Sequence, residues 1–196
     1  SEHIPGVGSR FDPRQFIGAL KKGCVNSVTV FAKCHHGWSY YPTRIGTPHP
    51  QLAEKDLLGR MVRACRENDI NVPVYITVQW DELTAREHPE WRVMKAENAP
   101  AGAPDASAMN QLTAGWHPLC LNHEPLLEQV VAQALEVIDL YHPDGLFMDI
   151  LLPWECLCPA CLRSMQAAGL DPENKEHRLR NAREVIFRYY RRIHEA

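Results

Sequence analysis

The chain has 196 residues, enough for one sizeable hydrophobic core and too few for two ordinary domains. Its formal net charge of −3 creates no strong field that would attract nucleic acid or anionic lipid. No window holds about 18 uninterrupted apolar residues, so a transmembrane helix is not expected. The first residues lack a signal-peptide pattern and read as a loop leaving a strand, which predicts a piece of a longer protein.

Helices and strands alternate along the chain. Asp12 and Pro13 begin the first helix, because Asp is a favoured cap and Pro suits the first helical position. Buried strands are predicted where β-branched and aromatic residues run together. The predicted elements, in chain order, are helix 12–23, strand 27–33, helix 54–68, strand 72–78, a short helix within 79–91, helix 125–141, strand 145–152, a short helix near 159 and a long basic helix from 175.

The order of strands and helices predicts a parallel sheet, because the strands are continuous apolar runs without alternation. No Gly-rich phosphate loop follows a strand, which disfavours an open nucleotide-binding sheet. We therefore predict an α/β fold of the (β/α)8 TIM-barrel type. Three clear strands make the chain a single partial barrel over residues 1–196, and the Ala/Gly/Pro-rich stretch 98–107 is interpreted as a surface insertion.

Polar and aromatic residues follow the three predicted strands. Because the carboxyl ends of parallel strands meet at one edge, these side chains are expected to share a rim. Aromatic faces beside polar groups suit sugar rings, although strand-end residues can also simply cap a barrel. The predicted rim residues are His35, His36, Gln79, Trp80, Asp81, Glu82 and Asp149, with the aromatic residues Trp38, Tyr40, Tyr41 and Trp154.

Asp149 is the predicted catalytic residue, because it interrupts an apolar run where an unused carboxylate would be costly to bury. The alternative is an Asp that caps the next helix or is held by backbone donors. His35 and His36 either hydrogen-bond substrate hydroxyls or contribute to a metal site. The chain has no H-x-H or H-E-x-x-H spacing, which makes the metal interpretation the weaker one.

Cysteines form a second constellation. Cys156, Cys158 and Cys161 fall within six residues and can place three thiolates around one tetrahedral zinc, with Cys120 as the fourth ligand. Four sulfur ligands leave no open position, so this zinc would be structural; free or oxidisable cysteines in a loop are the alternative. The other three cysteines, Cys24, Cys34 and Cys65, are expected to be small buried hydrophobic residues, in a protein of the reducing cytoplasm.

The C-terminal helix carries many arginines mixed with acidic residues, so we expect a solvated or interface face and no nucleic-acid patch. It would pack on further barrel units or on a second copy in a homo-oligomer. The expected partner of the chain is a carbohydrate or glycoside, with neither nucleic acid nor a membrane.

The segment FAKCHHGWSYYPT resembles family 29 α-L-fucosidases. A second segment, YHPDGLFMDI, looks like the strand of those enzymes that ends in the catalytic nucleophile. The resemblance implies that His35 and His36 bind substrate and that Asp149 is the nucleophile.

The C-terminal part is similar to family 42 β-galactosidases, which hold a structural zinc with cysteines so arranged. There the strand ends in a Glu general acid/base where this chain has Asp149, so both roles stay open. From Phe11 to Met165 the chain resembles the hypothetical glycosyl hydrolase 6 group.

The sequence therefore predicts a glycoside hydrolase with a structural zinc site of four cysteines. Such enzymes usually use two carboxyl groups. Asp81, Glu82 and Glu155 are weak candidates for the second one, and the resemblance implies that it lies on a later strand, so the chain alone is expected to be inactive. Two alternatives remain: a zinc-stabilised carbohydrate-binding barrel without catalysis, and a metal-dependent hydrolase in which a histidine and Asp149 share an ion.

Overall fold

The computed structural model describes residues 2–95 and 116–196, so the predicted insertion at 98–107 lies outside the described residues. The chain forms two compact units. Unit 1 comprises Ser1–Thr77 and Ala132–Asp149, and unit 2 comprises Val78–Val131 and Ile150–Ala196. Helix α4 (Glu124–Tyr141) contributes residues to both.

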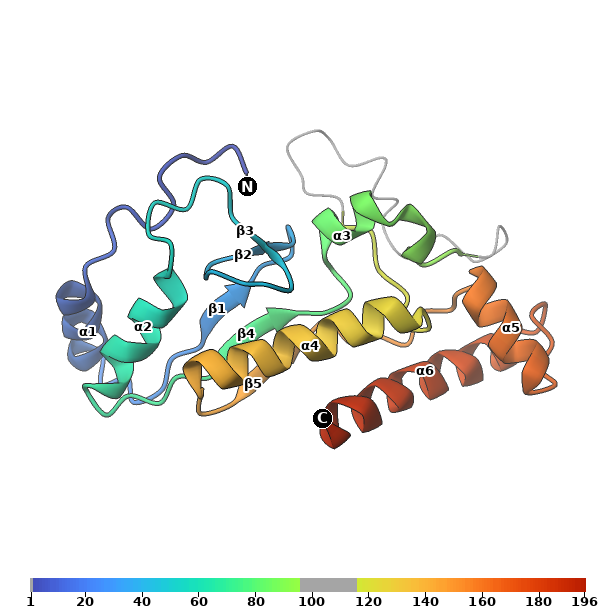
Figure 1. Cartoon of the computed structure of the whole chain (residues 1–196). Helices are drawn as coiled ribbons and strands as arrows, with labels where there is room; N and C mark the ends of the chain where they lie inside the picture. The colour runs from blue at the N-terminus through green and yellow to red at the C-terminus, as the bar shows by residue number, and fades with distance from the viewer. Residues whose placement is uncertain (1, 96–115) are drawn as a thin grey trace. The chain divides into compact units, whose positions relative to one another are not determined.

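Unit 1 contains a mixed sheet whose strand order is β3-β2-β1-β4-β5 (Figure 1). Its strands are β1 (Val30–Lys33), β2 (Trp38–Ser39), β3 (Thr47–Pro48), β4 (Val74–Thr77) and β5 (Leu146–Asp149). Strands β1, β4 and β5 run parallel, and β2 is antiparallel to β1. The predicted parallel arrangement of the three main strands is thus confirmed. Their carboxyl ends lie at one edge, where Thr77 pairs with Asp149.

Helices α1 (Pro13–Lys22) and α2 (Leu57–Arg66) of unit 1 lie next to each other (Figure 1). Asp12 caps α1 as predicted, because its carboxylate accepts hydrogen bonds from the amides of Arg14 and Gln15. Helix α2 begins later than predicted, because the side chain of Asp56 caps it by accepting the amide hydrogen of Gly59.

The two faces of the unit 1 sheet differ. Ala32 and Val74 are fully buried, whereas Phe31 and Phe147 are 43% and 51% exposed. Phe31 and Phe147 both pack on the ring of Tyr75, with centroids 4.2 Å and 5.4 Å away. Strand residues of period 2 share a face, so the sheet face that carries these rings also carries Thr77 and Asp149 two residues further on.

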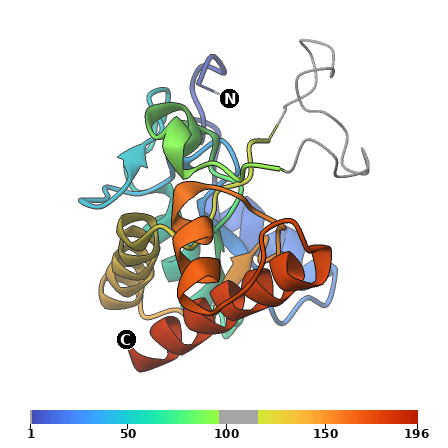
Figure 2. The same ribbon diagram turned by 90° about the vertical axis from the view of Figure 1, so that its right-hand side faces the viewer.

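Unit 2 is mainly helical in the part of the chain that is described. Its elements are α3 (Glu82–Glu87), the 3-10 turn Pro89–Trp91, the first turns of α4, α5 (Pro159–Ala167) and α6 (Lys175–Glu195). Figure 2 shows α5 (orange) lying against α6 (red). No helix of the described residues is both long and apolar enough to cross a bilayer.

Several local predictions need correction. The strands are shorter than predicted, and β2 and β3 were not expected, because two-residue strands leave no periodic pattern. Tyr41 is fully buried and hydrogen-bonded to Glu136, so the prediction that it lies on the rim is wrong. Cys24 is exposed at a positive φ of 54° after α1, so the prediction that it is buried is wrong as well, whereas Cys65 is buried.

Candidate functional site

Asp149 ends β5 in unit 1 and is partly buried. The hydroxyl of Tyr75 donates a hydrogen bond of 2.7 Å to its Oδ2 atom. The same hydroxyl lies 3.4 Å from each ring nitrogen of His35. The structure thus brings together a carboxylate, a phenol and an imidazole from three neighbouring parallel strands or the residues just beyond them.

His35 follows β1 and is held from the neighbouring strand. A hydrogen bond of 2.8 Å joins its Nδ1 atom to Oγ1 of Thr77 at the end of β4. Burial raises the pKa of Tyr75, and its hydrogen bond to Asp149 raises it further. The phenol therefore stays protonated at neutral pH and acts as a donor to Asp149. A rigid donor beside a carboxylate at a strand end suits binding of a polar ligand or charge stabilisation in a reaction.

Of the other rim residues predicted in unit 1, Trp38 and Tyr40 lie around His49. His36 is partly buried. The ring of Trp38 lies edge-on to His49 at 6.1 Å, and the ring of Tyr40 stacks on the same imidazole at 6.0 Å. Burial raises the pKa of Tyr40. Among the sequence-predicted substrate-binding residues of unit 1, His35 thus lies in the group around Asp149, whereas Trp38 and Tyr40 lie in an aromatic group around His49.

The three weak candidates for a second catalytic carboxylate each have a structural partner in unit 2. Asp81 is buried and caps α3, since it accepts hydrogen bonds from the amide and the hydroxyl of Thr84. Glu82 pairs with Nδ1 of His117 at 2.9 Å. Glu155 pairs with the guanidinium of Arg178 at 3.1 Å, with both side chains largely buried. Each of the three carboxylates is thus held by a neighbouring backbone or side-chain group.

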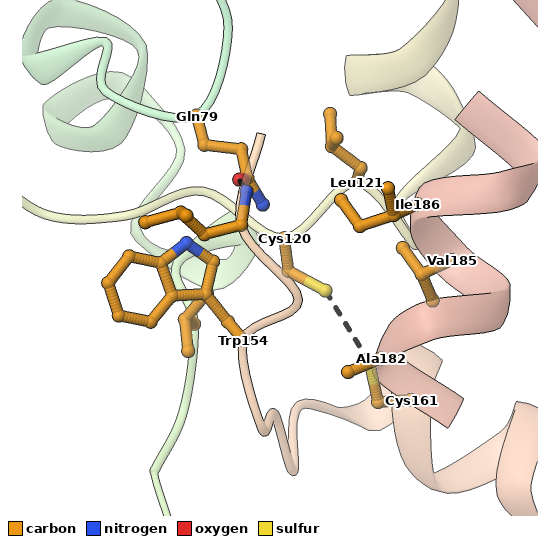
Figure 3. Close-up of a pocket in the computed structure, with 10 residues that line it drawn as sticks. Gln79, Cys120, Leu121, Trp154, Cys161, Ala182, Val185 and Ile186 are labelled. Atoms are coloured by element: carbon orange, nitrogen blue, oxygen red, sulfur yellow. Dashed lines mark hydrogen bonds between the residues drawn. The ribbon is translucent and has the colours of Figure 1, made fainter. Parts of the chain in front are cut away.

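Trp80 and Trp154, which the sequence predicts to bind substrate, both belong to unit 2. Trp80 stacks on Trp116, with centroids 6.2 Å apart. Trp154 lines a small apolar pocket with Gln79, Cys120 and Val185 (Figure 3). The indole Nε1 of Trp154 is buried and has no hydrogen-bond partner within the described residues. A pocket of about 10 Å³ has room for a single water at most and none for a sugar.

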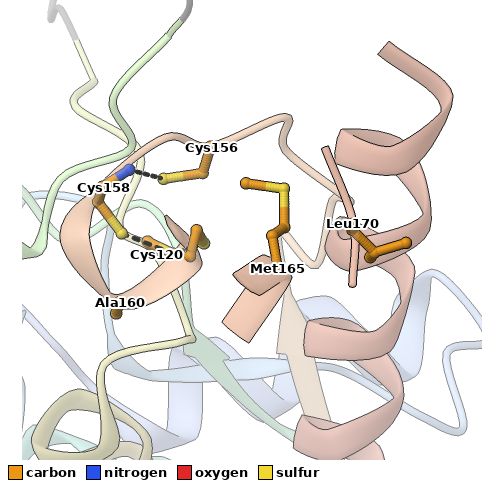
Figure 4. Close-up of a cluster of buried hydrophobic side chains, with 7 residues drawn as sticks. Cys120, Cys156, Cys158, Ala160, Met165 and Leu170 are labelled. Atoms are coloured by element: carbon orange, nitrogen blue, oxygen red, sulfur yellow. Dashed lines mark hydrogen bonds between the residues drawn. The ribbon is translucent and has the colours of Figure 1, made fainter. Parts of the chain in front are cut away.

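The four predicted zinc ligands converge in unit 2. Cys120, Cys156, Cys158 and Cys161 are all buried, and their sulfur atoms lie within 4.8 Å of one another. Figure 4 shows the side chains of Cys120 and Cys158 turned toward each other. The Cys120 sulfur lies 3.4 Å from that of Cys161 and 3.8 Å from that of Cys158. In tetrahedral coordination with zinc–sulfur bonds of about 2.3 Å, sulfur atoms are about 3.8 Å apart. The cysteine cluster therefore has the size of a four-sulfur metal site.

Donors surround the cysteine cluster. The amides of Met94 and Cys158 each donate to the sulfur of Cys156 at 3.4 Å, and the Asn122 side chain donates to that of Cys161 at 3.5 Å. The pKa of the Cys158 thiol is lowered, chiefly by the hydrogen bond between Cys158 and Cys120. Hydrogen-bond donors of this kind orient the sulfur ligands of a metal and stabilise their negative charge.

Two residues of the Asp149 group were missed in the sequence, namely Tyr75 and Thr77. Both lie inside the apolar run VPVYITV, where they look like ordinary strand formers. The signal that could have found them is the alternation of the strand. Residues 75 and 77 fall on one face and precede the strand end, where the candidate site was already expected.

A family model described as hypothetical glycosyl hydrolase 6 matches residues 12–150. Among curated proteins there is no match. Alpha-L-fucosidase isoenzyme 2 from Paenibacillus thiaminolyticus is 42% identical in sequence over 100% of this chain, with a TM-score of 0.89. This chain spans 28% of the length of that enzyme.

Two more distant structures share the fold. The Thermotoga maritima alpha-fucosidase in complex with fucose matches 72% of this chain and 29% of its own, with 22% identity and a TM-score of 0.51. A hypothetical protein from Ruminiclostridium thermocellum matches 93% of this chain and 84% of its own, with 14% identity and a TM-score of 0.62. The predicted α/β fold of the TIM-barrel type is thereby confirmed.

Proposed function

The chain belongs to the hypothetical glycosyl hydrolase 6 family, and on this premise we propose that it supplies part of a (β/α) barrel that hydrolyses α-L-fucosides. The match to a glycosyl hydrolase family and the similarity to a fucosidase support a glycosidase that acts on a carbohydrate. The choice of fucose rests on the 42% identity to the Paenibacillus alpha-L-fucosidase. The observation that carries the proposal is the hydrogen bond between Tyr75 and Asp149 at the carboxyl ends of parallel strands.

Asp149 is proposed as the nucleophile, or as the carboxylate that stabilises the oxocarbenium-like transition state. Tyr75 is protonated and donates to Oδ2, so that oxygen accepts a hydrogen bond. A general acid must instead carry a proton that it gives to the leaving group. The geometry therefore favours the nucleophile role over the acid/base role that the family 42 resemblance also allows.

Sugar recognition is proposed for His35 and His36, with Trp38 and Tyr40 as further contacts. The hydrogen bond of His35 to Thr77 fixes the ring orientation beside Asp149. The second catalytic carboxylate is proposed to lie on a later strand of the barrel, because Asp81, Glu82 and Glu155 are each engaged elsewhere. The 196-residue chain alone should then bind sugar without turning over.

A graft into the 42%-identical relative provides the test. These 196 residues would replace the matching segment of the Paenibacillus enzyme, and hydrolysis of 4-nitrophenyl α-L-fucopyranoside would be measured. We expect a folded, active chimera that loses more than about 99% of its turnover on Asp149→Asn. Asp139→Asn, at an exposed position of α4, is the matched control. A chimera that folds and stays inert, or that is indifferent to Asp149→Asn, would refute the proposal.

The cysteine cluster is proposed to hold one structural zinc ion. Its support is the convergence of four buried sulfur atoms with no open ligand position, together with the amide donors around them. Bound zinc would stabilise the fold of unit 2 without taking part in catalysis. The cytoplasmic location and the docking of α6 on further barrel units or a second copy stay predictions from the sequence.

A carbohydrate-binding chain without catalysis is the second candidate. It is favoured by the engagement of Asp81, Glu82 and Glu155 with other partners, and it predicts sugar binding that survives Asp149→Asn. Metal-dependent hydrolysis has less support. Within residues 2–95 and 116–196, the cysteine cluster is the one group of three or more potential ligands close enough to share an ion.

A further inference from the structure

Two tryptophans of unit 2 form an aromatic pair, and we propose that this pair is a binding platform for a neutral pyranose sugar. The rings of Trp80 and Trp116 are 6.2 Å apart between centroids and only 17° from parallel. Both side chains are partly buried, so neither belongs to the core. The proposal rests on the carbohydrate class of the proposed function, and it adds Trp116, Glu82 and His117 to the residues that contact sugar.

Backbone pairing holds the two indoles in place. Trp80 and Pro118 form an antiparallel bridge, and the amide of Leu119 donates to the carbonyl of Gln79 at 2.8 Å. Trp116 precedes Pro118 by two residues in an extended segment, so both side chains lie on the same side of that segment. This places Trp116 diagonally across from Trp80, which is the arrangement in which long side chains on paired strands meet.

The segment that carries Trp116 is also fixed on its other edge. The amide of Val93 donates to the carbonyl of Pro118, and the amide of Cys120 donates to the carbonyl of Trp91, each at 2.8 Å. Cys120 in turn belongs to the cysteine cluster. The platform is therefore built on a backbone that is paired on both sides and anchored at its end, so that little rotamer freedom is lost on binding.

A polar pair accompanies the indoles. Glu82 accepts a hydrogen bond from the backbone amide of His117 at 3.2 Å, and its carboxylate lies 2.9 Å from Nδ1 of the same residue. The side chain of His117 is 42% exposed. With Nδ1 donating to the carboxylate, the neutral ring presents Nε2 as an acceptor, which suits a sugar hydroxyl.

These groups define the ligand class. A pyranose of galacto configuration has adjacent C–H bonds on one ring face, which stack on the electron-rich face of an indole. Its hydroxyls at the ring edge would be met by Glu82 and His117. The carboxylate of Glu82 disfavours a phosphate or another anion, because like charges repel. The platform therefore fits a neutral sugar, and methyl β-D-galactopyranoside is a suitable probe.

Titration of this probe into the whole 196-residue chain, followed by saturation-transfer difference NMR, tests the platform. We expect saturable binding, an affinity about tenfold weaker in Trp116→Ala, and a loss of about threefold in Trp116→Phe, which keeps an aromatic face. Phe187→Ala is the matched control, because Phe187 is an exposed aromatic residue of α6 that belongs to neither proposed site. Galactitol carries hydroxyls but has no ring face, and it should not bind.

The outcomes separate the platform from the Asp149 group. The galactoside titration uses the 196-residue chain and the Trp116 variants, so its result does not depend on whether the fucosidase chimera is active. Circular dichroism establishes that each variant is folded, and Trp116→Phe provides a reading if Trp116→Ala does not fold. Absence of galactoside binding, equal affinity in wild type and a folded Trp116 variant, or equal binding of galactitol would each overturn the platform.

Discussion

The cysteine cluster of unit 2 and the Asp149 group of unit 1 (Asp149, Tyr75, His35 and Thr77) differ in burial and in whether a position is left for a substrate. The four cysteines are at most 4% exposed and converge on one another, which leaves no position for a substrate. Asp149 is only partly buried; the Tyr75 hydroxyl donates to its carboxylate, and His35 contacts that same hydroxyl. A closed set of ligands stabilises a fold, whereas a partly open set can react.

Loss of one cysteine of the proposed zinc site should have the largest effect. Cys158→Ser is expected to abolish binding of one zinc per chain and to lower the free energy of unfolding of unit 2 by more than about 3 kcal/mol, because metal binding to such sites is worth roughly 10–16 kcal/mol. Elemental analysis and hydrogen exchange would measure both effects. Cys24→Ser, at an exposed cysteine, should change neither. A chain that contains no zinc, or equal zinc in both variants, would remove the contrast between the two regions.

Glu136 of unit 1 sharpens the contrast, because its carboxylate is the common hydrogen-bond acceptor of several groups. It accepts hydrogen bonds from the hydroxyls of Tyr41 and Thr43 and from the amide of Arg44. Glu136→Ala should lower the free energy of unfolding of unit 1 by about 2–3 kcal/mol, since the buried Tyr41 hydroxyl loses its acceptor. Urea unfolding in the presence of EDTA measures this, with the exposed Asp139→Ala as control. Equal midpoints for the two variants would contradict the interpretation.

Removal of the Tyr75 hydroxyl, which donates to Asp149, should affect catalysis more than stability. Tyr75→Phe keeps the ring that stacks on Phe31 at 4.2 Å but loses the donor to the carboxylate. We expect kcat of the fucosidase chimera to fall about tenfold or more, because a hydrogen bond to a charged group is worth about 1.5–3 kcal/mol. The urea midpoint should barely move. Unchanged kcat would mean that Tyr75 does not support Asp149 in the reaction.

The smallest effect concerns alkaline pH. Burial raises the pKa values of Tyr41, Tyr75 and Tyr141 in the folded chain. Their contribution to stability is complete below about pH 10, the usual value for tyrosine, and is lost as the pH rises above it, because the unfolded chain ionises first. Absorbance at about 295 nm, where the phenolate absorbs, should show these tyrosines ionising only with unfolding. Reversible ionisation of all tyrosines near pH ~10 in the folded protein would contradict this.

Much of the fold was predictable because its signals are local. The cap at Asp12, the apolar runs of β1, β4 and β5, and the spacing of α4 each act within a few residues. The two-residue strands β2 and β3 were not predictable, because they exist only through pairing, β2 with β1 and β3 with β2. Tyr41 was misplaced for a related reason, since its partner Glu136 lies 95 residues away in the sequence.

The residues of the candidate sites also divide into those with a local sequence signal and those placed only by the fold. The cysteine cluster could be predicted because three of its members lie within six residues, and Asp149 because it interrupts an apolar run. Tyr75 was missed, because only the alternation of its strand, and no local motif, places it near a carboxylate 74 residues further on. The pairing of Trp80 with Trp116 likewise depends on the bridge between residues 80 and 118.

A crystal structure of the chain with L-fucose bound tests the central claim most directly. The account predicts the sugar at the carboxyl ends of β1, β4 and β5, with its anomeric carbon facing the carboxylate of Asp149 and a hydroxyl within hydrogen-bond distance of His35. A well-ordered sugar bound elsewhere, with Asp149 turned away from any ligand, would contradict it.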